Sequence, residues 1–132
     1  MVSCMKRFFL ILGLLLALPL AAVESETLAQ RTLRQIAERQ RTLLETAAKQ
    51  GDKLDEEAFR TQLQELTHSY ERLLYDSPNN AEVFAAYGYL LRKVDMRKQA
   101  AAMLLKANQL DSDIPLVKNQ LGNLLAEDGR PL

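Results

Sequence analysis

Hydrophobic residues recur at intervals of three, four and seven along most of the chain, and no segment alternates hydrophobic and polar residues. In the stretch from Glu24 to Gln50, which has no Gly or Pro, Ala29, Ile36 and Leu43 repeat at intervals of seven. Such intervals place apolar side chains on one face of a helix, whereas strict alternation would indicate a strand. The sequence therefore predicts an all-α protein.

Breaks in the pattern divide it into five expected helices. Gly51 ends the first helix, and Pro78 cannot continue the second. Asp55 stands where it can cap the start of the second helix. The first expected helix is the segment 24–50, and the second runs from Asp55 to the break at Ser77 and Pro78. The third starts near Ala81, and the fourth runs from a short break at 94–96 to Leu110. The fifth opens at 111–115 and is closed by Gly129 and Pro131.

The first residues have the three parts of a secretory signal peptide. Lys6 and Arg7 precede the apolar run 8–18, and Pro19 and small residues follow. The apolar stretch is shorter than the ~20 residues that a helix needs to cross the hydrocarbon core of a membrane. We expect a signal peptide at 1–23, with cleavage near residues 22–25.

Export is therefore the expected fate of the chain, to the periplasm or another extracytoplasmic compartment. An uncleaved leader that anchors the chain in the inner membrane is the alternative, and a buried helix of a cytosolic fold is a weaker one. Contact with the membrane is expected only if the leader stays. Cys4 precedes the apolar run, so it does not stand where a lipoprotein has its lipidated cysteine.

Composition and motifs exclude several classes of function. The chain has 17 Lys or Arg and 17 Asp or Glu, which argues against a strongly basic nucleic-acid-binding protein. Its single Cys excludes an internal disulfide framework and cysteine-based zinc sites. His68 is expected to be structural, and the cluster Asp52, Asp55, Glu56 and Glu57 to cap a helix. We expect no catalytic residues, no metal and no cofactor, and hence no enzyme.

The C-terminal half of the chain contains an internal repeat. Tyr87-Gly88 recurs as Leu121-Gly122, and Leu91 recurs as Leu125. A period of about 34 residues, with two helices in each unit, is typical of tetratricopeptide repeats (TPR), and the segment 81–112 resembles one such repeat. The resemblance implies these positions of packing between helices: Phe84, Tyr87, Gly88, Leu91, Ala100, Leu104 and Ala107 in a full repeat, and Leu121, Gly122 and Leu125 in a half repeat.

The chain also departs from the family pattern. Asp95, Arg97 and Ser112 stand where the family usually has Gly, Tyr and Pro, and Gly51-Asp52 interrupts the place of an earlier repeat helix. We expect two long helices at 24–78 as a modified cap, and a TPR-like unit of one full repeat plus a half repeat at 79–132. The expected fold is a TPR-like α-solenoid fragment of about five helices, built from antiparallel helical hairpins.

The resemblance implies a scaffold whose first helices line a concave groove for a protein or peptide partner. Amides suit the backbone of such a peptide, and Arg or Lys suit its carboxylates. The alternative is that the same residues are ordinary solvated positions. Carried onto this chain, the groove positions are Glu82, Ala85, Tyr89, Arg92 and Lys93 in the full repeat, and Leu116, Asn119, Asn123, Ala126 and Glu127 in the half repeat.

Two functions follow as expectations. The first is an exported, non-enzymatic adaptor that binds a protein partner in the bacterial cell envelope. The second is a structural component that self-associates or is anchored by its N-terminus. The stripe of Ala29, Leu33 and Ile36 on the first helix could bind another copy and form a homodimer. Gln40 interrupts that stripe, so a strong coiled coil is not expected.

Overall fold

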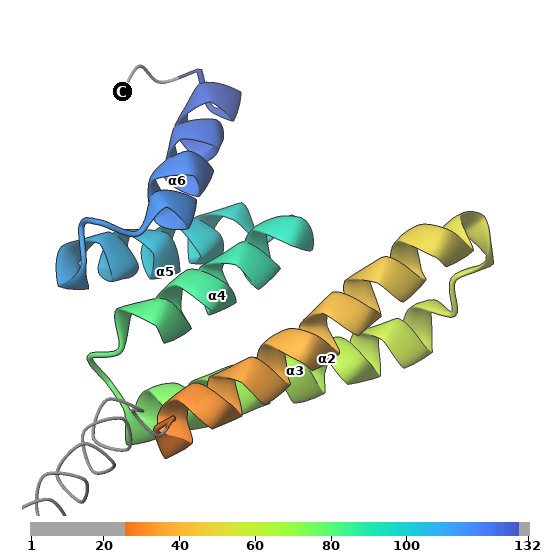
Figure 1. The fold of residues 1–132 in the computed structure, drawn as a ribbon. Helices are drawn as coiled ribbons and strands as arrows, with labels where there is room; N and C mark the ends of the chain where they lie inside the picture. The colour runs from red at the N-terminus through yellow and green to blue at the C-terminus, as the bar shows by residue number, and fades with distance from the viewer. Residues whose placement is uncertain (1–25, 130–132) are drawn as a thin grey trace, which may run out of the picture.

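The computed structural model describes residues 26–129, which are helical throughout apart from short connections and contain no strand (Figure 1). The predicted all-α fold is confirmed. The expected signal peptide lies outside the described residues, and no helix within them is long and apolar enough to cross a membrane. The elements are α2 (Leu28–Gln50), the 3-10 turn η1 (Gly51–Lys53), α3 (Glu56–Asp76), α4 (Ala81–Lys93), α5 (Arg97–Leu110) and α6 (Pro115–Glu127).

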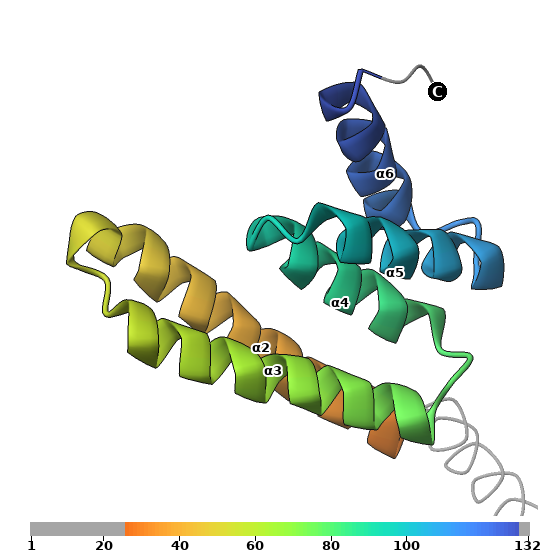
Figure 2. The same ribbon diagram turned by 180° about the vertical axis from the view of Figure 1, so that it is seen from behind.

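The helices pack as two antiparallel hairpins followed by a single helix. α2 lies beside α3, and α4 lies beside α5, as the views from both sides of the molecule show (Figure 1, Figure 2). α4 also contacts α2, α3 and α6, so it lies at the centre of the fold. α6 packs against α5 and α4 and crosses them steeply.

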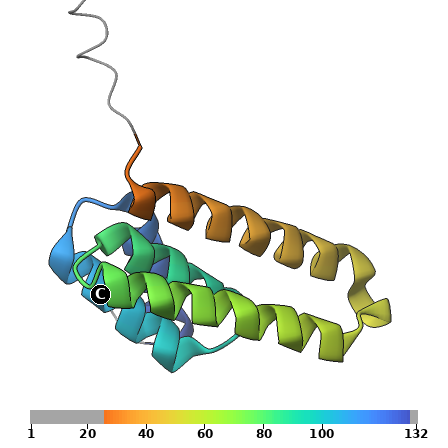
Figure 3. The same cartoon turned by 90° about the horizontal axis from the view of Figure 1, so that it is seen from below.

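The first hairpin is longer than the second. α2 and α3 have 23 and 21 residues, whereas α4 and α5 have 13 and 14. Seen from below, the turn at Gly51 lies beyond the end of the α4–α5 hairpin (Figure 3). From residue 44 to residue 65 no side chain is fully buried. We call this part of the α2–α3 hairpin its projecting end.

Side-chain caps fix where the first helices begin. Thr27 Oγ1 accepts a hydrogen bond from the backbone N of Gln30 at 3.1 Å, and Gln30 Oε1 accepts one from the backbone N of Thr27 at 2.9 Å. This capping box places the start of α2 after Thr27, so the predicted start at Glu24 is wrong. The predicted cap at Asp55 is confirmed, because its side chain accepts from Ala58 N at 3.1 Å.

The turn between α4 and α5 has the hydrogen bonds of a Schellman motif. Met96 N donates to Leu91 O at 2.8 Å, and Asp95 N donates to Arg92 O at 3.0 Å. Asp95 has a φ of 63°, a conformation that glycine adopts freely and other residues at a cost. Its carboxylate also pairs with Arg97 Nε at 2.9 Å. Asp95 therefore stands at a position that favours glycine, and its short polar side chain lowers the cost of the positive φ.

We expect Asp95→Val to lower the free energy of unfolding by about 1–2 kcal/mol, because a branched side chain clashes with the backbone at positive φ. Asp95→Gly should be neutral or slightly stabilising, since the exposed ion pair that it removes contributes little. Urea denaturation measures both. Asp95→Asn is the control, because it removes the charge and keeps a short side chain. A loss as large as that of Asp95→Val would show that the ion pair controls this turn.

Residues of α3, α4 and α5 form the middle of the core. The rings of Tyr70 and Tyr87 stack with their centroids 5.1 Å apart, and Tyr70 is fully buried. Gly88 faces α5: a Cβ added there would lie 2.7 Å from Leu104 Cγ and 3.3 Å from the carbonyl oxygen of Ala100. The close approach of α4 to α5 therefore depends on the missing side chain at Gly88.

The expected packing positions are buried in the full repeat and largely not in the half repeat. Tyr87, Gly88, Leu91, Ala100, Leu104 and Ala107 are buried, and Phe84 is half-buried. In α6, by contrast, Leu121, Gly122 and Leu125 are only half-buried, which differs from the expectation. The buried residues of α6 are Val117, Gln120 and Leu124.

The internal repeat explains this difference. Val117 and Leu124 stand one repeat period after Val83 and Leu90, and all four side chains are buried. With this face α6 packs back onto the preceding helices. The face that includes Leu125 corresponds to the part of α4 that α5 covers, and no helix covers it within residues 26–129.

Candidate partner-binding groove

A groove of about 940 Å³ lies where the projecting end of the α2–α3 hairpin passes the C-terminal end of α4. We call it the α2–α4 groove. Its lining combines small and apolar side chains with a few polar ones. The apolar lining residues are Ala37, Leu44, Ala47, Ala48, Phe59 and Val94, and the others are Gln40, Arg41, Glu45, Tyr89, Lys93 and Asp95.

α2 supplies most of the groove lining. Ala37, Leu44 and Ala48 follow each other at intervals of seven and four, so they share one face of the helix. Two of these three side chains are methyl groups, which leave room between α2 and the end of α4. Phe59 of α3, half-buried, adds an aromatic ring to the lining.

Gln40 is the buried polar residue of the groove lining, with an exposed fraction of 6%. Its Oε1 accepts a hydrogen bond from the Tyr70 hydroxyl at 2.5 Å. Burial raises the pKa of Tyr70 well above its usual value, so the hydroxyl stays protonated and donates. The hydrogen bond from Tyr70 therefore holds the Gln40 amide in the lining of the groove, and the nitrogen of such an amide is a hydrogen-bond donor.

The sequence contained a signal for this bond. Gln40 stands between Ile36 and Leu43 on the apolar stripe of α2, and a polar side chain at such a position needs a buried partner. Sequence reasoning took Gln40 only as an interruption of the stripe. The partner is 30 residues away on α3, and nothing local in the sequence points to Tyr70.

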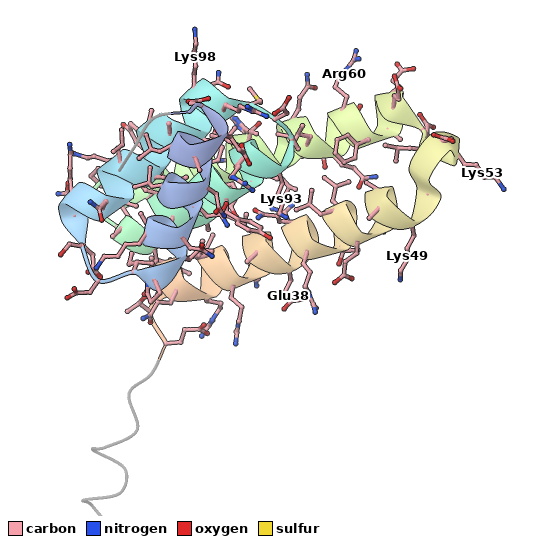
Figure 4. All side chains as sticks on the ribbon, turned by 90° about the horizontal axis from the view of Figure 1, so that it is seen from above. Glu38, Lys49, Lys53, Arg60, Lys93 and Lys98 are labelled. Atoms are coloured by element: carbon pink, nitrogen blue, oxygen red, sulfur yellow. The ribbon has the colours of Figure 1, made fainter. Side chains whose placement is uncertain are left out.

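Lys93 presents a cation to the groove. Its Nζ lies 5.3 Å from the centroid of the Tyr89 ring, within the range of a cation–π interaction. Lys93 lies between α4 and α2, whereas Lys53 points away from the tip of the hairpin (Figure 4). The second basic residue of the lining, Arg41, is bound to Glu38 at 2.6 Å.

Two residues expected to line a groove instead bind each other. Arg92 Nη2 of α4 lies 2.8 Å from Glu127 Oε1 of α6, and Arg97 of α5 approaches the same carboxylate at 3.9 Å. The Arg92 side chain is 19% exposed, so this ion pair is partly shielded from water. Arg92 and Glu127 therefore hold α6 against α4.

The other expected groove residues are dispersed. Ala85 is 4% exposed and belongs to the core. Glu82 lies one helix length from Lys93, about 16 Å along α4, beside the start of α2. Leu116, Asn119, Asn123 and Ala126 are exposed on α6.

Of the expected set, the structure brings Tyr89 and Lys93 into the α2–α4 groove. The expectation placed the groove on the first helices of the repeat units at 79–132 and gave the long first helix no part in it, whereas α2, with 23 residues against 13 in α4, lies beside the end of α4. The extra length brings the C-terminal half of α2 to the end of α4, and this half supplies the wall that sequence reasoning missed.

The remaining candidate residues do not form a second site. Residues 26–129 contain no group of three or more His, Cys, Asp and Glu side chains that could hold a metal ion. His68 is exposed, and its Nε2 lies 3.3 Å from Arg72 Nη2.

No family model matches the chain, and neither a curated protein nor a solved structure matches it. The groove's own chemistry and the internal repeat therefore provide the arguments for function.

Proposed function

We propose that this chain is an exported, non-enzymatic scaffold of the TPR type that binds a protein or peptide partner in the α2–α4 groove. The observation that carries the proposal is the groove itself, in which an apolar lining surrounds the side-chain amide of Gln40, held by Tyr70, and a cation at Lys93. The bacterial cell envelope is the proposed setting, because Lys6 and Arg7 before the apolar run 8–18 are typical of a signal peptide. No cofactor takes part.

The groove lining favours an amphipathic peptide that carries a carboxylate. Apolar side chains of the peptide would contact Leu44, Phe59 and Val94, a backbone carbonyl would accept from Gln40, and the carboxylate would pair with Lys93. A volume of about 940 Å³ lies within the range of roughly 300–1,000 Å³ that is common for binding pockets.

Photo-crosslinking tests this proposal. A photoreactive residue at Ala48, which is exposed in the groove, should capture a partner in the cell envelope that mass spectrometry identifies. We expect Lys93→Glu and Tyr89→Ala to reduce the yield about tenfold or more, because each removes a side chain that lines the groove. Lys53→Glu is the matched control, since it reverses a charge at the tip of the hairpin (Figure 4).

Equal crosslinking yields from the Lys93→Glu and Lys53→Glu variants would contradict the proposal. The intact mass of the protein from the envelope fraction tests the proposed export, and a mass that fits cleavage after Ala22 or after Ser25 supports it. A full-length mass in the membrane fraction would favour the anchored alternative.

Self-association is the second candidate function, and the other end of the first hairpin favours it. Leu28 and Tyr75 are 78% and 87% exposed, and Leu28 lines a groove of about 990 Å³ at the start of α2. Ile36 is only 2% exposed and belongs to the core of its own chain, so the expectation that it is free to bind another copy is wrong. A dimeric mass by light scattering, converted to a monomer by Leu28→Asp, would support this candidate.

A further inference from the structure

A second apolar groove lies at the C-terminal end of the fold, between α5 and α6. It has a volume of about 840 Å³, and we call it the α5–α6 groove. Leu105 at its edge is 52% exposed. The apolar lining residues are Ala101, Leu105, Leu121, Leu124 and Leu125, and the polar ones are Arg97, Lys98, Asn108, Lys118 and Asp128.

Two lining residues of this groove, Leu121 and Leu125, belong to a surface of α6 that repeats a surface covered elsewhere in the molecule. Three half-buried residues of α6 stand one repeat period after three buried residues of α4. In α4 this surface is buried against α5, with Gly88 directly facing Leu104. The residues are Leu121, Gly122 and Leu125 in α6, and Tyr87, Gly88 and Leu91 in α4.

α5 indicates what the repeated surface can accept. It packs on α4 with Ala100, Leu104 and Ala107, and all three side chains are fully buried. Small residues on either side of a leucine allow the two helix backbones to approach closely. Gly122, the repeat equivalent of Gly88, likewise has no side chain at the corresponding position of α6. A helix with a small–leucine–small stripe therefore has the shape that the α6 surface fits.

The charged residues that line the groove indicate which kind of helix it can bind. Of the basic lining residues, Arg97 is paired with Asp95 at 2.9 Å, which leaves Lys98 and Lys118 as the other cations of the groove beside the acid Asp128. In a symmetric dimer through this groove, a second copy of the chain would bring the same lysines toward this one, and like charges that oppose each other disfavour such pairing. The groove at the start of α2 is no better complement, because it has three Arg against two acids.

We propose that the α5–α6 groove binds an amphipathic helix of a partner protein that has acidic residues along its edges. The helix places a small–leucine–small stripe against Leu121 and Leu125, and its carboxylates pair with Lys98 and Lys118. It takes on α6 the place that α5 takes on α4. This surface is separate from the α2–α4 groove, so the chain holds two binding surfaces.

Two synthetic peptides and the full chain test this proposal. Both peptides carry the 14-residue sequence of α5 with a lactam bridge on the outer face to hold the helix. The acidic peptide has Glu in place of Arg97, Lys98 and Lys106, and the basic peptide keeps these residues. By fluorescence anisotropy we expect the acidic peptide to bind about tenfold more tightly at low salt, with a smaller difference at high salt.

Variants of the full chain locate the binding. Lys118→Glu, an exposed position, should weaken binding of the acidic peptide and strengthen that of the basic one. Leu125→Glu should abolish binding, because it puts a charge on the apolar wall. Lys93→Glu, in the α2–α4 groove, should leave the affinity unchanged, so this test is independent of the first groove.

Several outcomes would overturn the proposal. These are equal affinity for the two peptides, no binding of either, or loss of binding in Lys93→Glu alone. A dimer that Leu125→Glu dissociates would assign the groove to a second copy of the chain and would also overturn the proposal.

Discussion

Replacing Tyr70 with alanine should lower the free energy of unfolding by about 3–5 kcal/mol, because it removes a large, fully buried side chain and leaves a cavity. The ring also stacks on Tyr87, so the substitution removes an aromatic contact between α3 and α4. It leaves Gln40 without its hydrogen-bond donor as well. Tyr70 thus joins three helices, and we expect no other single aromatic truncation to cost more.

Tyr70→Phe separates the ring from the hydroxyl. It keeps the stacked ring and removes only the group that donates to Gln40, so we expect a loss of about 1–2 kcal/mol from the buried acceptor left unpaired. Urea denaturation followed by circular dichroism measures both variants. The control is Tyr75→Ala, whose side chain is 87% exposed and should change stability by less than about 0.5 kcal/mol. A neutral Tyr70→Phe would show that the hydrogen bond does not stabilise the fold.

Overpacking the contact between α4 and α5 is the second large effect that we expect. Ala100→Leu should cost about 1–3 kcal/mol, because Ala100 is fully buried and its carbonyl oxygen lies 3.3 Å from a Cβ placed at Gly88. Gly88→Ala should also destabilise, because its new methyl group would overlap Leu104. That overlap should outweigh the gain of about 1 kcal/mol that alanine brings to a helix interior.

Gly122→Ala is the matched control for the helix contact. Gly122 is the repeat equivalent of Gly88, but it is only half-buried in α6. We expect Gly122→Ala to stabilise the chain by about 0.5–1 kcal/mol through helix propensity alone. The midpoints of thermal and urea denaturation should therefore shift in opposite directions in the two alanine variants. If both variants were stabilised, the close contact at Gly88 would be refuted.

Local signals were sufficient to predict the helices. Gly51 and Pro78 end helices for reasons that lie in single residues, and Asp55 caps α3 as expected. The start of α2 was missed although Thr27 and Gln30 have the spacing of a capping box, a Ser or Thr followed three residues later by a Glu or Gln, so the signal was present in the sequence. The resemblance to tetratricopeptide repeats stays a prediction that is based on the period of the internal repeat.

The candidate site was harder to predict, because it depends on how helices of different length lie together. Lys93 and Tyr89 were expected in a groove and are found in one, whereas Arg92 was expected there and binds Glu127. A side chain's place in a helix predicts the face that it occupies but not the neighbour that meets it. Gln40 illustrates the same limit, since its partner comes from another helix.

The projecting end of the first hairpin has a consequence for motion. Between Leu43 and Leu66 the side chains are at most half-buried, so this segment can open locally at a smaller free-energy cost than the core. The same segment supplies Leu44, Ala48 and Phe59 to the α2–α4 groove. The wall of the groove that the α2–α3 hairpin supplies can therefore move more easily than the wall that α4 supplies. An occupant that bridges the two walls would slow amide exchange at the hairpin tip, including residues of the tip that it does not touch. The groove would accept partners of differing shape at some loss of affinity for each.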